Sequence, residues 1–561
     1  MGTKTIQIEK RAGHRIQHTV PMVKIAAFVH KDYINTVMHT IGRLESIQLI
    51  DAHQSLKEFK EPEIPESTDF SLKIATLISK ADYLRSLLKV KLRKRKVGAP
   101  VESVDTLLKW AEEKITLMEG EVTYIQNEMA RLKKEDLNDS ERDVIMQARL
   151  IEVSKKVGSD LETISEALEA QQRIEDAKAL MVHTKNVYAF EGWVPKERLN
   201  RVLNTIKDSA AGYGDIISVD RAPASAKDVH SDYERPPSLL RYPSVTGVFA
   251  VFSGLTKAFG MPSYYEVDPT LPFLITFPIV FGLMFGDVGH GALLLASGII
   301  FYLLRGRLAL KFKRGSLIYF VIAGAPLIAI NGAAAMIIGF LYGEFFGSEE
   351  WFREFTGLPG PLWFSPIHSP MTLLKYAIMF GVFQISLGLL LDLINKLSSR
   401  RFREAITGPI PWLWLYWSGS YLVFSYGWAV FSVIFNLTIM GLYILLPFGV
   451  LVALKLVEHG FNGVNEALEA FLMSFSHTVS YARILALKMV HTAFSILILP
   501  TSLLTMPLFI IGTIILIGIF EGMLAFLHTL RLHWIEWFTK FYRGEGKPFQ
   551  PFSTRRHPPL V

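Results

Sequence analysis

The stretch from Glu469 to His491 is apolar enough to cross a membrane, yet it contains five charged or ionisable side chains. They are Glu469, His477, Arg483, Lys488 and His491. An ionised side chain at the bilayer centre costs about 2.5–3.5 kcal/mol on insertion scales. Folding alone does not require that cost, so an intramembrane arginine is a functional candidate. A second such segment follows at Leu508–Phe541, with Glu521, His528, Arg531 and His533. Two consecutive charged spans suggest an ion path.

The composition is that of a membrane protein. Half of the residues are hydrophobic, and 38 Phe and 10 Trp suit lipid contact and interfacial belts. The net charge of +7 comes from basic residues that lie mainly in loops beside apolar stretches. This pattern predicts contact with anionic lipid, and no nucleic acid partner. Because the chain has no cysteine, it has no disulfide, thiol nucleophile or cysteine metal site.

Residues 1–235 are predicted to form a cytoplasmic arm. The N-terminus has no apolar core of the kind that signal peptides contain, so we expect this part to stay in the cytoplasm. Two β-α-β patterns, over residues 20–55 and 185–222, predict one split α/β lobe. Their expected strands are Met22–His30, Ile47–Ile50, Asn186–Pro195 and Ile216–Asp220, and their expected helices are Lys31–Leu44 and Lys196–Ile206.

Between the two halves of the lobe, residues 65–183 are predicted to be a coiled-coil hairpin. Apolar residues there recur at alternating steps of four and three: Val104, Leu108, Ala111, Ile115, Met118, Val122, Ile125, Met129 and Leu132. A polar turn at Lys133–Asp143 precedes a returning helix, and an earlier helix around Leu77 joins the bundle. The basic run Lys91–Lys96 suits either lipid headgroups or an acidic partner, or else a solvated helix end, which we favour.

After a linker at residues 236–270, residues 271–545 predict an α-helical transmembrane domain of about eight helices, the last two long and tilted. The expected spans are Pro272–Phe285, Val288–Leu304, Ser316–Leu341, Met371–Ile394, Trp412–Phe435, Leu437–Val457, Ala467–Leu499 and Leu508–Phe538. Basic residues follow the second, fourth and eighth spans, so the positive-inside rule places both termini in the cytoplasm. Residues 546–561 then form a cytoplasmic tail.

In the charged spans, Arg483 and His491 lie at i and i+8, roughly on one helix face. Glu469, Ser476 and Ser480 form a weakly polar stripe that leads toward Arg483. We expect one polar route past Glu469 and a second past His491 and Glu521. A permanently protonated guanidinium between them suits an electrostatic barrier. Alternatively, these charges pair to lock helices together, and a Lys488–Glu521 ion pair fits that reading.

Asp287 and His290 lie in a glycine-rich segment, Met284–Gly291, between the first two predicted spans. They could line an outer vestibule or ligate a metal. We favour a turn whose polar side chains satisfy free backbone groups, because one Asp and one His make a weak metal signal. No metal site is predicted.

The sequence contains no phosphate-binding loop of the G-x-x-x-x-G-K-[ST] type, no G-x-S-x-G nucleophile elbow and no H-E-x-x-H helix. We expect no cofactor and no catalysis by this chain alone. Nucleotide hydrolysis coupled to the ion path would take place on another polypeptide.

Several long motifs, in order, resemble those of the membrane stator subunit of V-type and archaeal A-type rotary ATPases, called subunit a or subunit I. They are "GWVP" at Gly192–Pro195, "ERPPSLLRYPSV" at Glu234–Val245, Met261–Gly291, "SHTVSYARILALKMVH" at Ser476–His491 and Glu521–Phe552. The resemblance covers nearly the whole chain. Residue by residue, it puts the family's essential arginine at Arg483. The half-channel residues fall on Glu469, His491, Glu521 and Arg531, with His477 and His528 in the same spans.

The resemblance implies a stator beside a rotating proteolipid ring, whose carboxylates meet Arg483 while ions pass through two half-channels. It implies peripheral-stalk subunits on the arm, a central-stalk cap subunit beneath the ring and, indirectly, the ATP-binding head. The location would be a prokaryotic plasma membrane, with H⁺ or Na⁺ as the ion. Two features depart from the family: no further β-α-β units between residues 100 and 185, and Lys488 in a charged span. A free-standing ion-coupled transporter and a scaffold without ion traffic are the alternatives.

Overall fold

In a computed structural model of the chain, residues 19–53, 67–88, 104–132, 139–223, 235–240, 247–311, 316–427, 435–500 and 505–554 are described. The basic run Lys91–Lys96 lies outside these ranges, as do most of the turn at Lys133–Asp143 and the N-terminal segment up to residue 18. The chain divides into two compact units. One comprises mainly Pro21–Ala222 together with residues from Phe549, and the other comprises mainly Pro237–Pro548.

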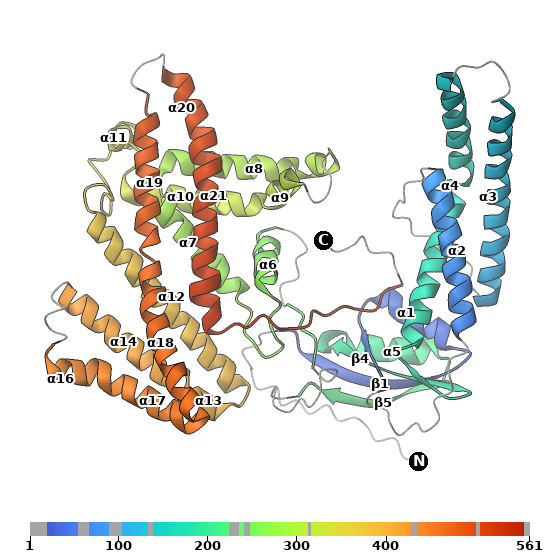
Figure 1. Ribbon diagram of the computed structural model, residues 1–561, viewed down its shortest axis with the longest axis horizontal. Helices are drawn as coiled ribbons and strands as arrows, with labels where there is room; N and C mark the ends of the chain where they lie inside the picture. Colours follow the sequence, from blue (N-terminus) through green and yellow to red (C-terminus); the bar gives the residue numbers. More distant parts are fainter. Residues whose placement is uncertain are drawn as a thin grey trace. The chain divides into compact units, whose positions relative to one another are not determined.

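The first unit contains an antiparallel sheet with the strand order β2-β4-β1-β5, and β3 also pairs with β4. The strands are β1 Met22–His30, β2 Gln48–Ile50, β3 Val182–His183, β4 Val187–Pro195 and β5 Gly214–Arg221. Two helices, α1 Ile34–Leu44 and α5 Leu199–Ser209, share one apolar core with the sheet (Figure 1). Ile25, Ala27 and Val29 alternate along β1 and are fully buried, as a half-covered strand requires.

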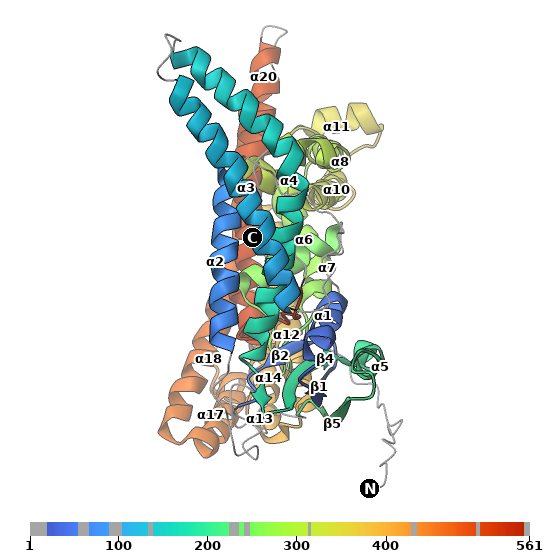
Figure 2. The same cartoon turned by 90° about the vertical axis from the view of Figure 1, so that its right-hand side faces the viewer.

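A helical bundle connects the two halves of this lobe. Its helices are α2 Ser67–Leu87, α3 Val104–Leu132 and α4 Asp139–Lys178, which lie side by side in Figure 2. The repeating apolar residues of α3 from Leu108 to Val122 are buried against Ile74–Leu88 of the first helix and Val157–Leu168 of the third. Ile174 and Ala177 then enter the core of the lobe, so α4 belongs to both parts.

The C-terminal residues belong to the lobe and not to a separate tail. The backbone N–H of Phe552 donates to the carbonyl oxygen of Ile47 at 2.7 Å, and its ring packs against the lobe core. Ser553 donates to Glu45 at 3.0 Å. The sequence assigned residues 546–561 to a cytoplasmic tail, and the structure packs residues 549–554 of it on the lobe, where Phe552 finds apolar cover.

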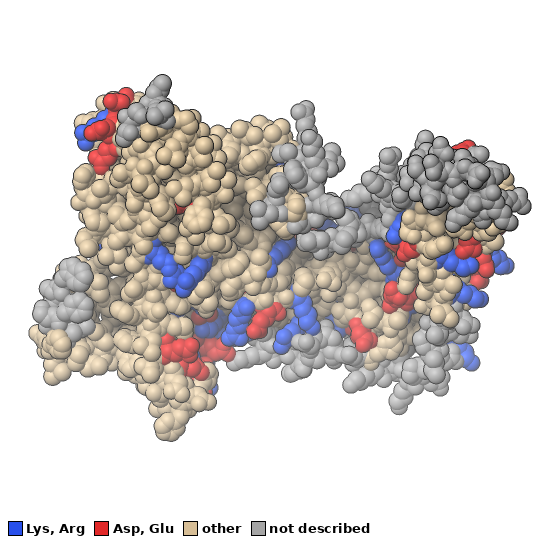
Figure 3. All heavy atoms as spheres, turned by 45° about the horizontal axis from the view of Figure 1, so that its top comes forward, with Lys and Arg blue, Asp and Glu red and all other residues tan. Residues whose placement is uncertain are grey.

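The second unit is helical. Its helices are α6 Val248–Phe259, α7 Thr270–Phe285, α8 Val288–Lys311, α9 Leu317–Ala323, α10 Ala325–Tyr342, α11 Glu349–Thr356, α12 Pro370–Ser398, α13 Phe402–Thr407, α14 Pro409–Tyr426, α16 Leu437–Met440, α17 Leu446–His459, α18 Phe461–Ser480, α19 Arg483–Ile498, α20 Met506–Gly512 and α21 Gly522–Arg531. Short π-helical segments at Gly441–Leu445, Thr513–Glu521 and Leu532–Trp537 continue three of them. Much of this unit's surface is uncharged on the face seen in Figure 3.

Within the described residues, six helical segments are long and apolar enough to cross a membrane. They are Val288–Gly306, Ala325–Tyr342, Pro370–Ser398, Leu437–His459, Phe461–Ile498 and Met506–Lys540. The predicted span Pro272–Phe285 corresponds to the short helix α7, and Trp412–Phe435 overlaps α14, which is not among the six. The predicted span Ser316–Leu341 is divided at Gly324 into α9 and α10. The count of eight spans therefore stays a prediction.

Candidate functional site

Arg483 begins helix α19 directly after a break in the span. Tyr481 and Ala482 separate it from α18, and the backbone there tightens to bonds between residues three apart, such as Ile484 N–H to the Tyr481 carbonyl at 3.0 Å. The Tyr481 ring is fully buried, and its hydroxyl donates to Gln384 of α12 at 3.0 Å. Gly381 makes room for this ring, because a Cβ at that position would lie 2.6 Å from it. The buried tyrosine thus anchors the break that carries Arg483.

Arg483 faces an open cavity of about 530 Å³ between the last two spans. Helix α19 runs beside α20 and α21 in Figure 1, and α18 contacts the π-helical segment Leu532–Trp537 that follows α21. Four predicted site residues line the cavity with Arg483, namely Ser476, His477, Ser480 and Arg531. The guanidinium is 26% exposed, so it can meet a group that approaches from outside this chain.

Glu536 is the principal cavity residue that sequence reasoning missed. Its carboxylate is almost fully buried, accepts a hydrogen bond from Ser480 at 2.5 Å and lies 3.6 Å from Nη1 of Arg483. Its Oε2 atom has no hydrogen-bond partner in the described part of the chain. A usable signal existed, because Glu536 is the only acidic residue between Glu521 and Glu545. The cavity therefore holds two cations, Arg483 and Arg531, and one buried carboxylate.

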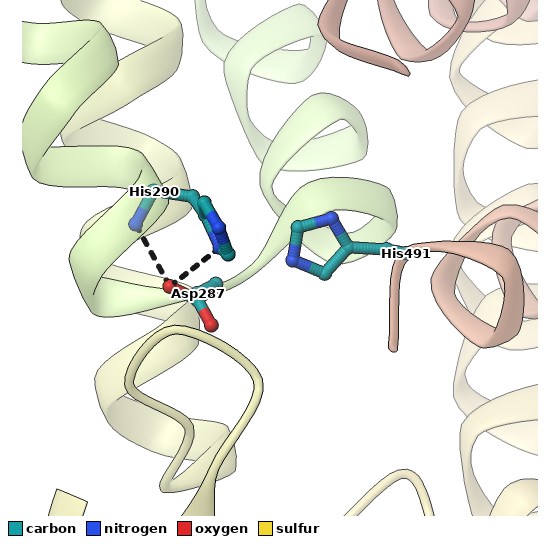
Figure 4. Close-up of side chains that lie close together, drawn as sticks. All are labelled: Asp287, His290 and His491. Carbon is teal, nitrogen blue, oxygen red and sulfur yellow. Dashed lines mark hydrogen bonds and ion pairs between the residues drawn. The ribbon is translucent and has the colours of Figure 1, made fainter. Parts of the chain in front are cut away.

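A second polar group, formed by Asp287, His290, His491 and Glu521, is buried between the last two spans and the start of α8. Nδ1 of His491 in α19 lies 2.8 Å from the Glu521 carboxylate at the end of the π-helical segment Thr513–Glu521. Both side chains are at most 2% exposed. The His290 ring stands edge-to-face against the His491 ring with centroids 5.2 Å apart. Figure 4 shows Asp287, His290 and His491 converging from the α7–α8 turn, α8 and α19.

Asp287 has the turn role that the sequence favoured. It accepts hydrogen bonds from the backbone N–H groups of His290 at 2.8 Å, Phe346 at 3.1 Å and Gly347 at 2.6 Å. It thereby joins the start of α8 to the loop after α10. Gly339 allows this approach, because a Cβ there would collide with the backbone of Asp287. Asp287 and His290 also border His491, so the turn is part of the buried polar group.

Lys488 pairs with Glu344, and the suggested Lys488–Glu521 ion pair is wrong. The Lys488 ammonium lies 2.6 Å from the Glu344 carboxylate and donates to the Gly286 carbonyl at 2.7 Å. Both charged side chains are completely buried. Glu521 is bonded to His491 instead, because the helix turns of α19 present Lys488 and His491 to different neighbours.

The remaining predicted residues are more scattered. Glu469 is exposed on α18, on the order of 20 Å along the helix before Arg483, and is not among the residues lining the cavity. His528 is half-buried on α21, where the positive charges of Arg483 and Arg531 act on it. The structure thus brings most of the predicted residues into two groups, one around Arg483 and one around His491, and leaves Glu469 and His528 outside both.

Comparisons with known proteins all lead to the same family. The family described as "V-type ATPase 116kDa subunit family" matches residues 152–353 and 456–554. The A-type ATP synthase subunit I of Pyrococcus abyssi is 27% identical, over 91% of this chain and 74% of that protein. Subunit I of Pyrococcus horikoshii is 25% identical, over 89% of this chain and 73% of that protein. The vacuolar proton translocating ATPase 100 kDa subunit of Dictyostelium discoideum is 25% identical, over 67% of this chain and 60% of that protein.

Proposed function

Because this chain belongs to the V-type ATPase 116kDa subunit family, and so is an integral membrane subunit of a rotary ATPase, we propose that it forms the two ion half-channels of the stator. The observation that carries the proposal is the position of Arg483. It faces an open cavity that also contains Arg531 and Glu536, whereas His491, eight residues further along the same helix, belongs to a fully buried polar group.

The two polar groups are separated along α19. Eight residues of helix correspond to about 12 Å. Of the residues between them, Ile484, Leu485 and Leu487 belong to an apolar cluster, and the charge of Lys488 is balanced by its buried ion pair with Glu344. A continuous polar pore would let ions leak past the ring, whereas two routes that end at different depths force each ion to travel on the ring. This separation supports half-channels over a through-channel.

The cavity around Arg483 supplies the inner half-channel. A guanidinium stays protonated under all relevant conditions. It would therefore attract an ionised carboxylate on the ring and repel the transported cation. Ser480 and Glu536 also line the cavity, and Oε2 of Glu536, which has no hydrogen-bond partner among the described residues, offers a place for an arriving proton. The stripe through Ser476 toward Glu469 continues this route along α18.

The His491–Glu521 pair supplies the outer half-channel. An imidazole bonded to a carboxylate at 2.8 Å can take a proton on one nitrogen and release one from the other. His290 and Asp287 extend the polar surface beyond this pair as a vestibule.

The arm would bind the peripheral stalks, and the ring, the cap subunit beneath it and the ATP-binding head would complete the complex. ATP chemistry would take place on those other chains. We place the protein in a prokaryotic plasma membrane with both termini in the cytoplasm. The residues described from 104 to 178 are helical, so stalk contact would lie mainly on the lobe around Trp193.

The alternatives differ in what they require. A free-standing transporter would typically use paired broken helices in related halves, whereas the charges here concentrate in the last two spans. A scaffold has no use for the buried ionisable groups at His491, Glu521 and Glu536. Purification from native membranes distinguishes a stator subunit from a free-standing transporter. The proposal expects a small proteolipid and two large ATP-binding subunits to copurify, and isolation of the chain alone in mild detergent would contradict it.

A further inference from the structure

The polar group around His491 contains buried nitrogens that lack hydrogen-bond partners among the described residues. They are Nε2 of His491 and both ring nitrogens of His290. Nδ1 of His290 lies 3.1 Å from Asp287, but not in hydrogen-bond alignment. An unsatisfied buried polar group costs about 1–3 kcal/mol. Three unsatisfied nitrogens so close together indicate a binding site for a ligand. Each neutral imidazole has one nitrogen with a free lone pair, and such lone pairs beside a carboxylate favour a cation.

From this geometry we propose that Asp287, His290 and His491 form a binding site for a divalent transition-metal ion of the Zn²⁺ class. The three residues can each offer one ligand atom, and these atoms all lie within 4.8 Å of one another. All three side chains are buried and point toward a common centre (Figure 4). Two imidazoles and a carboxylate, with one position left for water, are a typical ligand set for zinc.

The neighbouring residues hold the ligands in suitable states. The Glu521 carboxylate lies 2.8 Å from Nδ1 of His491, so the proton of a neutral imidazole is held on Nδ1 and the Nε2 lone pair is free for a metal. Three backbone N–H groups fix the Asp287 carboxylate: Oδ1 accepts two of these hydrogen bonds, whereas Oδ2 accepts one and so retains a lone pair for a metal. This outer support is the arrangement seen around protein-bound zinc.

Charge and ligand type select the ion. A divalent cation would be balanced by two carboxylates, Asp287 and Glu521, so the buried site would be neutral overall. Two nitrogen ligands disfavour Mg²⁺ and Ca²⁺, which prefer oxygen ligands. Zn–N bonds of about 2.0 Å place ligand atoms about 3.3 Å apart in a tetrahedron. Binding would therefore draw the ligands inward, mainly by rotation of the two imidazole rings.

One consequence rests on the proposed function. A metal on Nε2 of His491 would occupy the nitrogen that exchanges protons in the outer half-channel, so Zn²⁺ would inhibit transport. The binding itself does not rest on that function. Binding without inhibition would leave the site intact and count against the half-channel role of His491.

The test is Zn²⁺ binding to the purified full-length chain in detergent, by titration calorimetry and by Zn X-ray absorption. We expect the wild type to bind Zn²⁺ at least about tenfold more tightly than His290→Gln or His491→Gln. His368→Gln is the matched control, because His368 is an exposed histidine of the same unit and should leave affinity unchanged. Equal affinity in the wild type and in both site variants would overturn the proposal.

The absorption spectrum needs no variant and so covers the case in which a variant fails to fold. We expect the outer-shell pattern of two imidazoles together with oxygen ligands. A spectrum of oxygen ligands alone, or no Zn²⁺ retained after washing, would overturn the proposal as well.

Discussion

The ammonium of Lys488 lies 2.6 Å from the carboxylate of Glu344, and neither side chain has any exposed surface. The same ammonium donates to the carbonyl of Gly286, one residue before Asp287. This pair joins α19 to the turn between α7 and α8 and to the loop after α10. The segment that carries Arg483 and His491 is therefore fixed to the residues that border the outer polar group.

Lys488→Met should destabilise the chain strongly, because it leaves the Glu344 carboxylate buried without its partner. Loss of one member of a buried pair costs about 3–5 kcal/mol. The double change Lys488→Met with Glu344→Leu should recover most of that loss. Thermal unfolding in detergent measures the cycle. Recovery by Glu521→Gln instead of Glu344→Leu would show that the pair has been misassigned.

Glu521→Gln should slow ion transport without abolishing it, because an amide can still bond His491 and water can replace part of the polar path. His491→Ala should slow transport further, since it removes the proton-exchanging ring. ATP-driven acidification, or Na⁺ uptake, in reconstituted vesicles measures both. Wild-type rates in both variants would remove this pair from the ion path.

Glu536→Gln should reduce transport by about 100-fold, the low end for a positioned proton-transfer group, if its Oε2 receives protons in the inner half-channel. Ser480→Ala should have a smaller effect, because it removes only a hydrogen bond to the same carboxylate. Glu354→Gln on the short helix α11 is a control at an acidic position away from the cavity. We expect the control to transport fastest, Ser480→Ala more slowly and Glu536→Gln slowest. An inverted order would contradict the role of Glu536.

Residues 1–235 should fold as a soluble and mostly helical fragment, because the lobe and bundle bury their own cores. Joining residues 546–561 to it by a flexible linker should raise its stability, since Phe552 covers part of the lobe. In that fusion Phe552→Ala should cost on the order of 1–2 kcal/mol, because the ring is only partly buried. Urea unfolding followed by circular dichroism compares the three proteins. A fragment that aggregates without detergent would contradict the assignment of this half.

The sequence predicted most where a pattern was local. Heptad spacing from Leu108 to Val122 identified the buried face of the bundle, because helix geometry alone decides which residues face inward. Charged residues in apolar spans identified Arg483, His491 and Glu521. Partners distant in sequence were not predictable: Glu344 lies 144 residues from Lys488, and only the folded turn brings them together.

Glu536 was missed for a different reason. It lies near the end of the last span, where a charged residue is ordinary at a membrane surface. It lies in the π-helical segment Leu532–Trp537, and its carboxylate meets Ser480 and Arg483 of the preceding span only in the folded chain. The docking of Phe552 on the lobe was equally hidden, because the two Phe residues of this short segment, Phe549 and Phe552, form no periodic pattern.

The most direct measurement is ATP-driven ion transport by the complex reconstituted with Arg483→Ala. We expect the complex to assemble, since the guanidinium is partly exposed and an apolar side chain suits the bilayer, and we expect transport to fall to the level of empty vesicles. Arg353→Ala on α11, also an exposed arginine, is the matched control and should transport at the wild-type rate. Transport near the wild-type rate in Arg483→Ala would contradict the account.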